Sequence, residues 1–229
     1  MSGEHTVKAF DDELADLAGD VFRLGGLAAS LVSDASAALI ARDTRIAEDV
    51  VERDRSIDDL QASIEQKAIR LMAIRQPVAI DLRRAVAAIK MAYNLERCGD
   101  LAKNIAKRTI IIAETDLPTA LIRPLGRMSK LVVKRLNMAL DAYARDDLIH
   151  ATEVWALDRE VDEQYDSVVR ELLTYMMGDA RLITACTHLL FVAKNLERIG
   201  DHATNIAELV HYELTGEQLK VRPTFGATP

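Results

Sequence analysis

The sequence predicts an all-α protein made of two tandem three-helix bundles, and three observations lead to this fold class. The segment at residues 94–106 returns at residues 195–207 with 10 of its 13 positions identical, which indicates an internal duplication. Apolar residues recur at helical spacing through nearly the whole chain. The 229 residues include only 10 glycines and 5 prolines, and 28% of them are charged, which favours helices over an all-β fold.

Six long antiparallel helices, three in each copy, follow from this periodicity and from the short connections. In the first copy, Gly25 and Gly26 are expected to interrupt the first helix, Asp43 or Thr44 to cap the second, and Pro77 to end it. The expected ranges are approximately 6–42, 44–75, 79–114, 124–145, 147–178 and 179–214.

Turn residues also delimit the helices of the second copy. Pro124 is expected in or just before the first turn of the fourth helix, where a proline is tolerated. Asp146 or Asp147 opens the fifth helix, which ends at Gly178, and the sixth helix ends at Gly216.

The duplication predicts the domain organisation as well. We expect a first three-helix domain over residues 1–115 and a second over residues 116–216. Residues 217–229 combine proline, glycine and threonine without apolar periodicity, so we expect a flexible tail there.

Charge and cysteine usage narrow the class of protein. The net charge of −7 offers no basic stripe, which argues against nucleic acid as a partner. Cys98 and Cys186 have no paired spacing, so we expect reduced cysteines in helices, in the cytoplasm. Residues 1–20 lack the apolar core of a signal peptide, and unbroken apolar runs are too short to span a bilayer.

Paired carboxylates recur in both copies and are the main candidates for a functional site. Helical residues four positions apart lie about 40° from each other around the axis, so a Glu-x-x-x-Asp pair presents both carboxylates on one face. The third and sixth helices carry such a pair, and the second and fifth carry Asp-x-x-x-Asp. The predicted metal ligands are Glu96, Asp100, Glu197, Asp201, Asp54, Asp58, Asp158 and Asp162.

Carboxylates gathered in a partly desolvated patch repel one another, so a positive charge must neutralise them. Divalent or trivalent metal ions are one source, and carboxylate oxygens suit iron, manganese or magnesium, with zinc possible. Ion pairs are the other source, from the neighbouring Arg97, Arg198, Arg55 and Arg159. The residues alone leave both explanations open.

Three smaller features accompany the carboxylate pairs. Asn104 and Asn205 are either further ligands or members of a buried hydrogen-bond network. Gly99 and Gly200 are costly inside helices, and they either mark close approach of a neighbouring helix or leave space beside the acidic stripe. His202 has no counterpart in the first copy and is expected to be a surface group or a satellite of the site, not a ligand.

Two motifs together resemble those of the PhoU family of phosphate-transport accessory and signalling proteins. They are Arg-Gln-Pro-Val-Ala-Ile-Asp-Leu-Arg at residues 75–83 and the doubled Leu-Glu-Arg-x-Gly-Asp-x-Ala-x-Asn-Ile-Ala. The likeness covers nearly the whole chain and implies metal clusters bound through the Glu-x-x-x-Asp pairs. The aspartate pairs on the neighbouring helices are the matching positions.

The resemblance also implies a function. It implies a cytoplasmic negative regulator of the phosphate-starvation response that modulates phosphate uptake and is not an enzyme. Its implied partners are the ATPase subunit of the phosphate ABC transporter and a membrane sensor histidine kinase. The resemblance further implies a homodimer that reaches the membrane only through these partners.

Two alternatives remain at this point. The first is a carboxylate-bridged di-metal enzyme, a class that typically uses two Glu-x-x-His pairs. This chain has one such pair, Glu208 and His211, and Lys107 stands where Glu208 would have its counterpart. The second alternative is a purely structural helical scaffold, in which removal of Glu96 and Asp100 would change neither metal content nor signalling.

Overall fold

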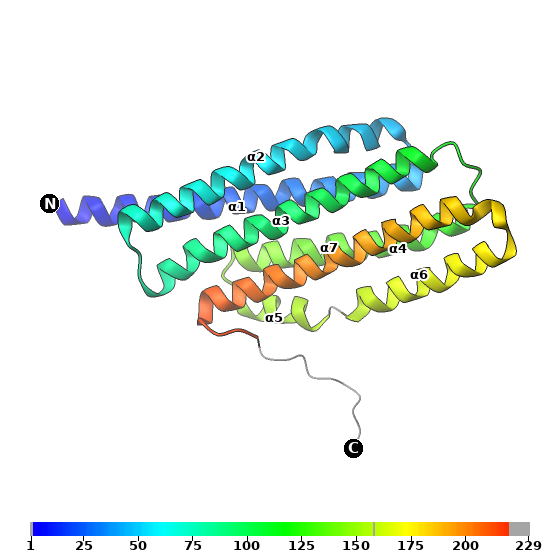
Figure 1. The fold of residues 1–229 in the computed structure, drawn as a ribbon. Helices are drawn as coiled ribbons and strands as arrows, with labels where there is room; N and C mark the ends of the chain where they lie inside the picture. The colour runs from blue at the N-terminus through cyan, green and yellow to red at the C-terminus, as the bar shows by residue number, and fades with distance from the viewer. Residues whose placement is uncertain (1, 158, 220–229) are drawn as a thin grey trace, which may run out of the picture.

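The computed structural model describes residues 2–157 and 159–219, and every regular element in these ranges is helical. The helices run antiparallel as two neighbouring sets of rods, with α3 and α7 side by side (Figure 1). The predicted all-α fold of two three-helix bundles is confirmed. The elements in chain order are α1 (Ser2–Ala41), α2 (Thr44–Arg75), α3 (Ala79–Ile112), α4 (Thr119–Ala144), α5 (Leu148–Ala156), α6 (Arg159–Gly178), the 3-10 helix η1 (Ala180–Leu182) and α7 (Ile183–Thr215).

The helix ends follow local capping chemistry. The side chain of Asp43 accepts hydrogen bonds from the backbone N–H of Arg45 and Ile46, so Asp43 is the cap that opens α2. Asp147 caps α5 in the same way. Gly216 ends α7 with a φ of 78°, a left-handed conformation that favours glycine.

Gly25 and Gly26 do not interrupt the first helix as expected, because α1 runs unbroken through both. Gly25 is buried, and a Cβ at this position would lie 2.3 Å from Cδ2 of Leu140 on α4. The glycine therefore serves the close approach of α1 to α4, which joins the two sets of helices.

The expected position of Pro124 at the start of the fourth helix is also wrong, because α4 already begins at Thr119. A proline at this position removes one hydrogen bond, to the carbonyl of Ala120. Ala120 is exposed, so water can hydrate that carbonyl. The cost is therefore small enough for the helix to begin earlier.

The fifth helix, expected to be continuous, is instead two segments in the described residues. The backbone N–H of Leu157 bonds to the carbonyls of both Glu153 and Val154, a tightened last turn that closes α5. Glu160 and Asp162 in the first turn of α6 favour a new helix start, because carboxylates stabilise a helix N-terminus.

The domain division at residue 115 stays a prediction. Of the expected flexible tail, residues 217–219 have no regular secondary structure, and residues 220–229 lie outside the described residues. Cys98 and Cys186 are both buried, unbridged and helical, as expected.

One helix is long and apolar enough to cross a membrane. An 18-residue window within Phe10–Ala41 of α1 has a mean hydropathy of 1.6. This is an average over the window, and charged and polar residues interrupt the segment, so the expectation about unbroken apolar runs is not contradicted. Half of the apolar window is buried inside the protein, where α1 packs against α2, α3 and α4. Leu17, Leu24 and Leu31 are at most 2% exposed. Burial of its apolar face in the core accounts for the composition of this helix.

A buried carboxyl group lies where the end of α7 meets the start of α3. Glu213 is 5% exposed, and its Oε1 lies 3.5 Å from Nε of Arg84. Its Oε2 has no hydrogen-bond partner among the residues that the structure describes. Burial raises the pKa of Glu213 to about 7, an effect that the charge of Arg84 opposes and that of Asp146 reinforces.

We expect the free energy of unfolding to fall less with rising pH in the variant Glu213→Gln than in the wild type. Between the ordinary pKa of 4.5 and about 7, the folded protein holds a proton on Glu213 that the unfolded chain has released. The free energy of unfolding therefore falls as pH rises through this window, by a total of about 3 kcal/mol. Urea denaturation at a series of pH values should show a shallower fall in the variant and greater stability than wild type at pH 8. Parallel stability curves for the two proteins would contradict this assignment.

Candidate metal-binding sites on α3 and α7

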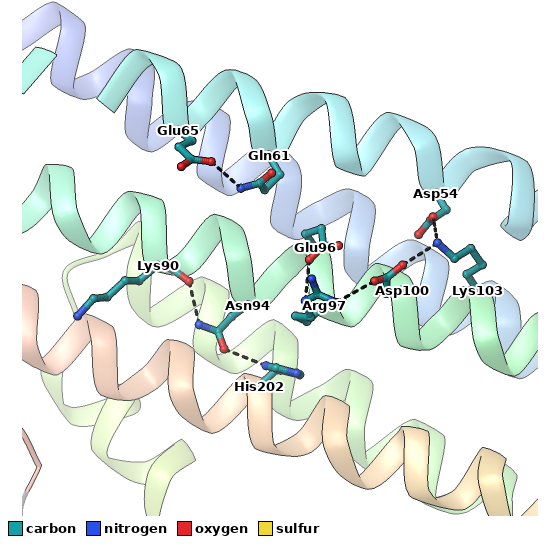
Figure 2. Close-up of polar contacts among 10 residues, drawn as sticks. All are labelled: Asp54, Gln61, Glu65, Lys90, Asn94, Glu96, Arg97, Asp100, Lys103 and His202. Atoms are coloured by element: carbon teal, nitrogen blue, oxygen red, sulfur yellow. Dashed lines mark hydrogen bonds and ion pairs between the residues drawn. The ribbon is translucent and has the colours of Figure 1, made fainter. Parts of the chain in front are cut away.

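The first acidic site lies between α2 and α3 and contains basic as well as acidic side chains (Figure 2). Lys103 forms an ion pair with Asp54, and its Nζ lies 2.6 Å from Oδ1 of Asp100. Nε of Arg97 lies 3.1 Å from Oε2 of Glu96, and its Nη1 donates to Oδ2 of Asp100 at 3.1 Å. The predicted carboxylates thus come together, and the chain supplies cations to them.

Glycines in α3 and α7 set the spacing of these helices from their neighbours. A Cβ on Gly99 would lie 2.8 Å from Cδ1 of Ile57 and 3.5 Å from Oδ1 of Asp54. A Cβ on Gly200 would lie 3.1 Å from Cγ1 of Val161 on α6. The expectation that both glycines mark close helix–helix approach is confirmed. At Gly99 this approach places Asp54 over the acidic face of α3.

Burial and mutual repulsion change the proton affinity of the first site. Burial, reinforced by the charges of Asp100 and Asp58, raises the pKa of Glu96 to about 7 against the opposing charge of Arg97. Burial and the charge of Asp54 also raise the pKa of Asp58. Burial acts in the same direction on Asp100, but hydrogen bonding and charge from Lys103 outweigh it and lower the pKa of Asp100.

The second acidic site lies between α6 and α7 and holds a set of carboxylates suited to a metal ion. Asp162, Glu197 and Asp201 each offer an oxygen, and these oxygens lie within 4.8 Å of one another. No other trio of acidic, histidine or cysteine side chains in the described ranges meets this limit. Nζ of Lys194 donates to Oε1 of Glu197 at 2.5 Å, while Oε2 is buried and accepts no hydrogen bond from any described residue.

The remaining predicted site residues have different outcomes. Asp58 is exposed at the edge of the first site, and Asn104 is exposed on α3. Asn205 donates from Nδ2 to Oδ1 of Asn94 at 3.3 Å, so it takes part in a hydrogen-bond network. Asp158 lies outside the described residues.

Asn94 connects α3 to α7 and was not singled out by sequence reasoning. It is 9% exposed, and its Nδ2 donates to the carbonyl of Lys90 at 2.8 Å. Nδ1 of His202 donates to Oδ1 of Asn94 at 2.9 Å (Figure 2). Burial, together with the charges of Arg198 and Arg97, lowers the pKa of His202 to about 4, so the ring is neutral. His202 is half-buried between the helices, which excludes an exposed surface group and fits the alternative of a satellite beside the site.

Two repeats that each present a Glu-x-x-x-Asp pair to a neighbouring helix define a class of duplicated helical-bundle proteins with one acidic site per repeat. The family model described as the PhoU domain matches this chain twice, at residues 21–109 and 125–210. The chain belongs to the PhoU family, as the motif resemblance indicated.

Relatives and solved structures agree with this assignment. The chain is 60% identical over 216 residues to the phosphate-specific transport system accessory protein PhoU homolog of Caulobacter vibrioides, covering 94% of each chain. It is 47% identical to the homolog of Rhizobium meliloti, covering 95% of this chain and 92% of that one. The crystal structure of PhoU from Pseudomonas aeruginosa matches with a TM-score of 0.85 and 39% identity, covering 91% of this chain and 100% of that one.

The buried amide of Asn94 should matter more to stability than the exposed amide of Asn104 on the same helix. Asn94→Ala leaves the Nδ1–H of His202 without its acceptor, which we expect to lower the free energy of unfolding by about 1–3 kcal/mol. Asn104→Ala, the matched control, should change it by less than about 0.5 kcal/mol. Urea denaturation measures both. Equal effects of the two substitutions would show that the contact between α3 and α7 contributes nothing.

Proposed function

We propose that this protein is a cytoplasmic, non-enzymatic regulator of phosphate uptake that represses the phosphate-starvation response when phosphate is plentiful. It acts as an adaptor between the ATPase subunit of the phosphate ABC transporter and a membrane sensor histidine kinase. It works as a homodimer and reaches the membrane only through these partners. The observation that carries this proposal is the 60% identity, over 94% of the chain, to a relative named as an accessory protein of the phosphate-specific transport system.

The positions of Glu208 and His211 argue against the di-metal enzyme. Oε1 of Glu208 accepts a hydrogen bond from Nε1 of Trp155 at 2.9 Å. Nδ1 of His211 lies 3.0 Å from the carbonyl oxygen of Glu217. The two side chains thus have separate partners, whereas a Glu-x-x-His pair in such an enzyme directs both to one metal.

We further propose a metal ion in the second acidic site, held by Asp162, Glu197 and Asp201. Oxygen ligands from two helices suit iron, manganese, zinc or magnesium. The buried Oε2 of Glu197, which no described group satisfies, fits this assignment, because a buried carboxylate oxygen needs a donor or a cation. A bound metal would link α6 to α7 and neutralise the repulsion between these three carboxylates.

Removing the proposed ligands should remove the metal. We expect elemental analysis of the purified protein to find iron, manganese, zinc or magnesium, and Glu197→Ala with Asp201→Ala to lose it. The control Glu163→Ala with Asp166→Ala removes two exposed carboxylates from α6 and should keep the metal. Equal metal content in all three proteins would place the metal elsewhere, and a metal-free wild type would refute the site.

Deleting the gene should activate phosphate-scavenging genes even in phosphate-rich medium, because the proposed repressor of the starvation response is then absent. Alkaline phosphatase activity in the deletion strain measures this effect, and expression of the wild-type protein should return it to the repressed level. Unchanged phosphatase activity in the deletion strain would refute the regulatory function.

A further inference from the structure

The two acidic sites differ in one residue that changes their charge. Within the duplicated segment, only three positions differ, and one of them places Lys103 in the first copy where Thr204 stands in the second. Lys103 lies one helical turn after Asp100, so its side chain lies on the same side of α3 as the Glu-x-x-x-Asp pair.

Lys103 bridges two of the carboxylates of the first site. Its ammonium joins the carboxylates of two helices, Asp54 from α2 and Asp100 from α3 (Figure 2). The Lys103 side chain is 21% exposed and that of Asp54 only 5%, so this contact is largely withdrawn from water. Arg97 pairs with Glu96 and with the other oxygen of Asp100. Three carboxylates therefore already have a positive partner from the chain itself, while Oδ1 of Asp54 is buried and accepts no hydrogen bond from a described residue.

The second site has no ammonium at the equivalent position. Thr204 is buried, and its Oγ1 donates to the carbonyl of Gly200 in its own helix at 3.3 Å. A threonine hydroxyl carries no charge, so it cannot neutralise the carboxylates around it. The neighbouring Lys194 contacts Oε1 of Glu197 and approaches from the opposite side along α7, one turn before Glu197.

We infer that Lys103 takes the place of a metal ion in the first acidic site, so that the first repeat binds no metal while Lys103 is present. A divalent cation at this site would need the oxygens of Asp54 and Asp100 that the ammonium already holds. It would also lie beside that ammonium, and like charges a few ångströms apart in a partly buried site repel strongly. The ammonium of Lys103 thus excludes a metal ion from the first acidic site. This inference complements the proposed function, which places a metal in the second repeat.

The test isolates the first repeat. The parent protein carries Glu197→Ala and Asp201→Ala, so the second site is removed and Mn²⁺ is the probe. Isothermal titration of the metal-free parent should detect no Mn²⁺ binding. Adding Lys103→Thr, which copies the residue of the second repeat, should create a site for about one Mn²⁺ per chain, because the carboxylates then lack their ammonium. Lys103→Arg, the matched control that keeps the charge, should bind none.

Folding is followed in the same proteins by circular dichroism. Mn²⁺ should raise the Tm of the Lys103→Thr protein and leave that of the parent unchanged. If the threonine variant does not fold without metal, Lys103→Gln keeps a neutral donor for Asp54 and should gain the same binding. Mn²⁺ binding by the parent, or no gain in either neutral variant, would overturn the inference. Neither result depends on whether the intact second site holds a metal, so this test and that of the proposed function can fail separately.

Discussion

Neutralisation of carboxylates between closely packed helices is the constraint on which both halves of this protein depend. The packing that builds the core also brings acidic side chains from two helices close together, where they repel, and those of the first site are partly desolvated. In the first half, ion pairs with Lys103 and Arg97 neutralise the carboxylates. In the second half Lys194 reaches one oxygen of Glu197 and the other is left without a described donor. Each half thus has one buried carboxylate oxygen without a described donor, Oδ1 of Asp54 in the first and Oε2 of Glu197 in the second. The difference between the halves is Lys103, which stands where the second half has Thr204.

Small residues make this arrangement possible. Gly99 and Gly200 stand inside long helices, where glycine weakens the helix, but each lets a neighbouring helix approach more closely than a side chain would allow. Gly25 has the same role between α1 and α4. The intrinsic cost of glycine in a helix is thus offset by packing that continues along the whole contact.

Much of the fold could be predicted from the sequence, because duplication, helical periodicity and capping residues are local signals. The errors fall where tertiary contacts or backbone detail outweigh such signals. Gly25 was expected to interrupt a helix but is covered by Leu140, and Pro124 is tolerated because the carbonyl that it leaves unpaired is exposed. The end of α5 at Ala156 could not be predicted, because no proline or glycine stands there.

The carboxylates of the site were predictable, but their partners were not. Spacing places Glu96 and Asp100 on one face, whereas the pairing of Lys103 with Asp54 depends on how α2 packs against α3. The substitution of lysine by threonine between the repeats was visible in the sequence, and it was the one available signal that the two sites differ. The contact of Asn94 with His202 had no comparable signal, because it forms between repeats.

That contact has a consequence for how the two halves communicate. With a pKa of about 4, His202 keeps one proton on its ring at every pH found in cytoplasm, so its bond to Asn94 does not respond to acidity. The hydrogen bond between α3 and α7 is therefore kept throughout this pH range. A change of cytoplasmic pH therefore cannot by itself break or remake this hydrogen bond between the two halves.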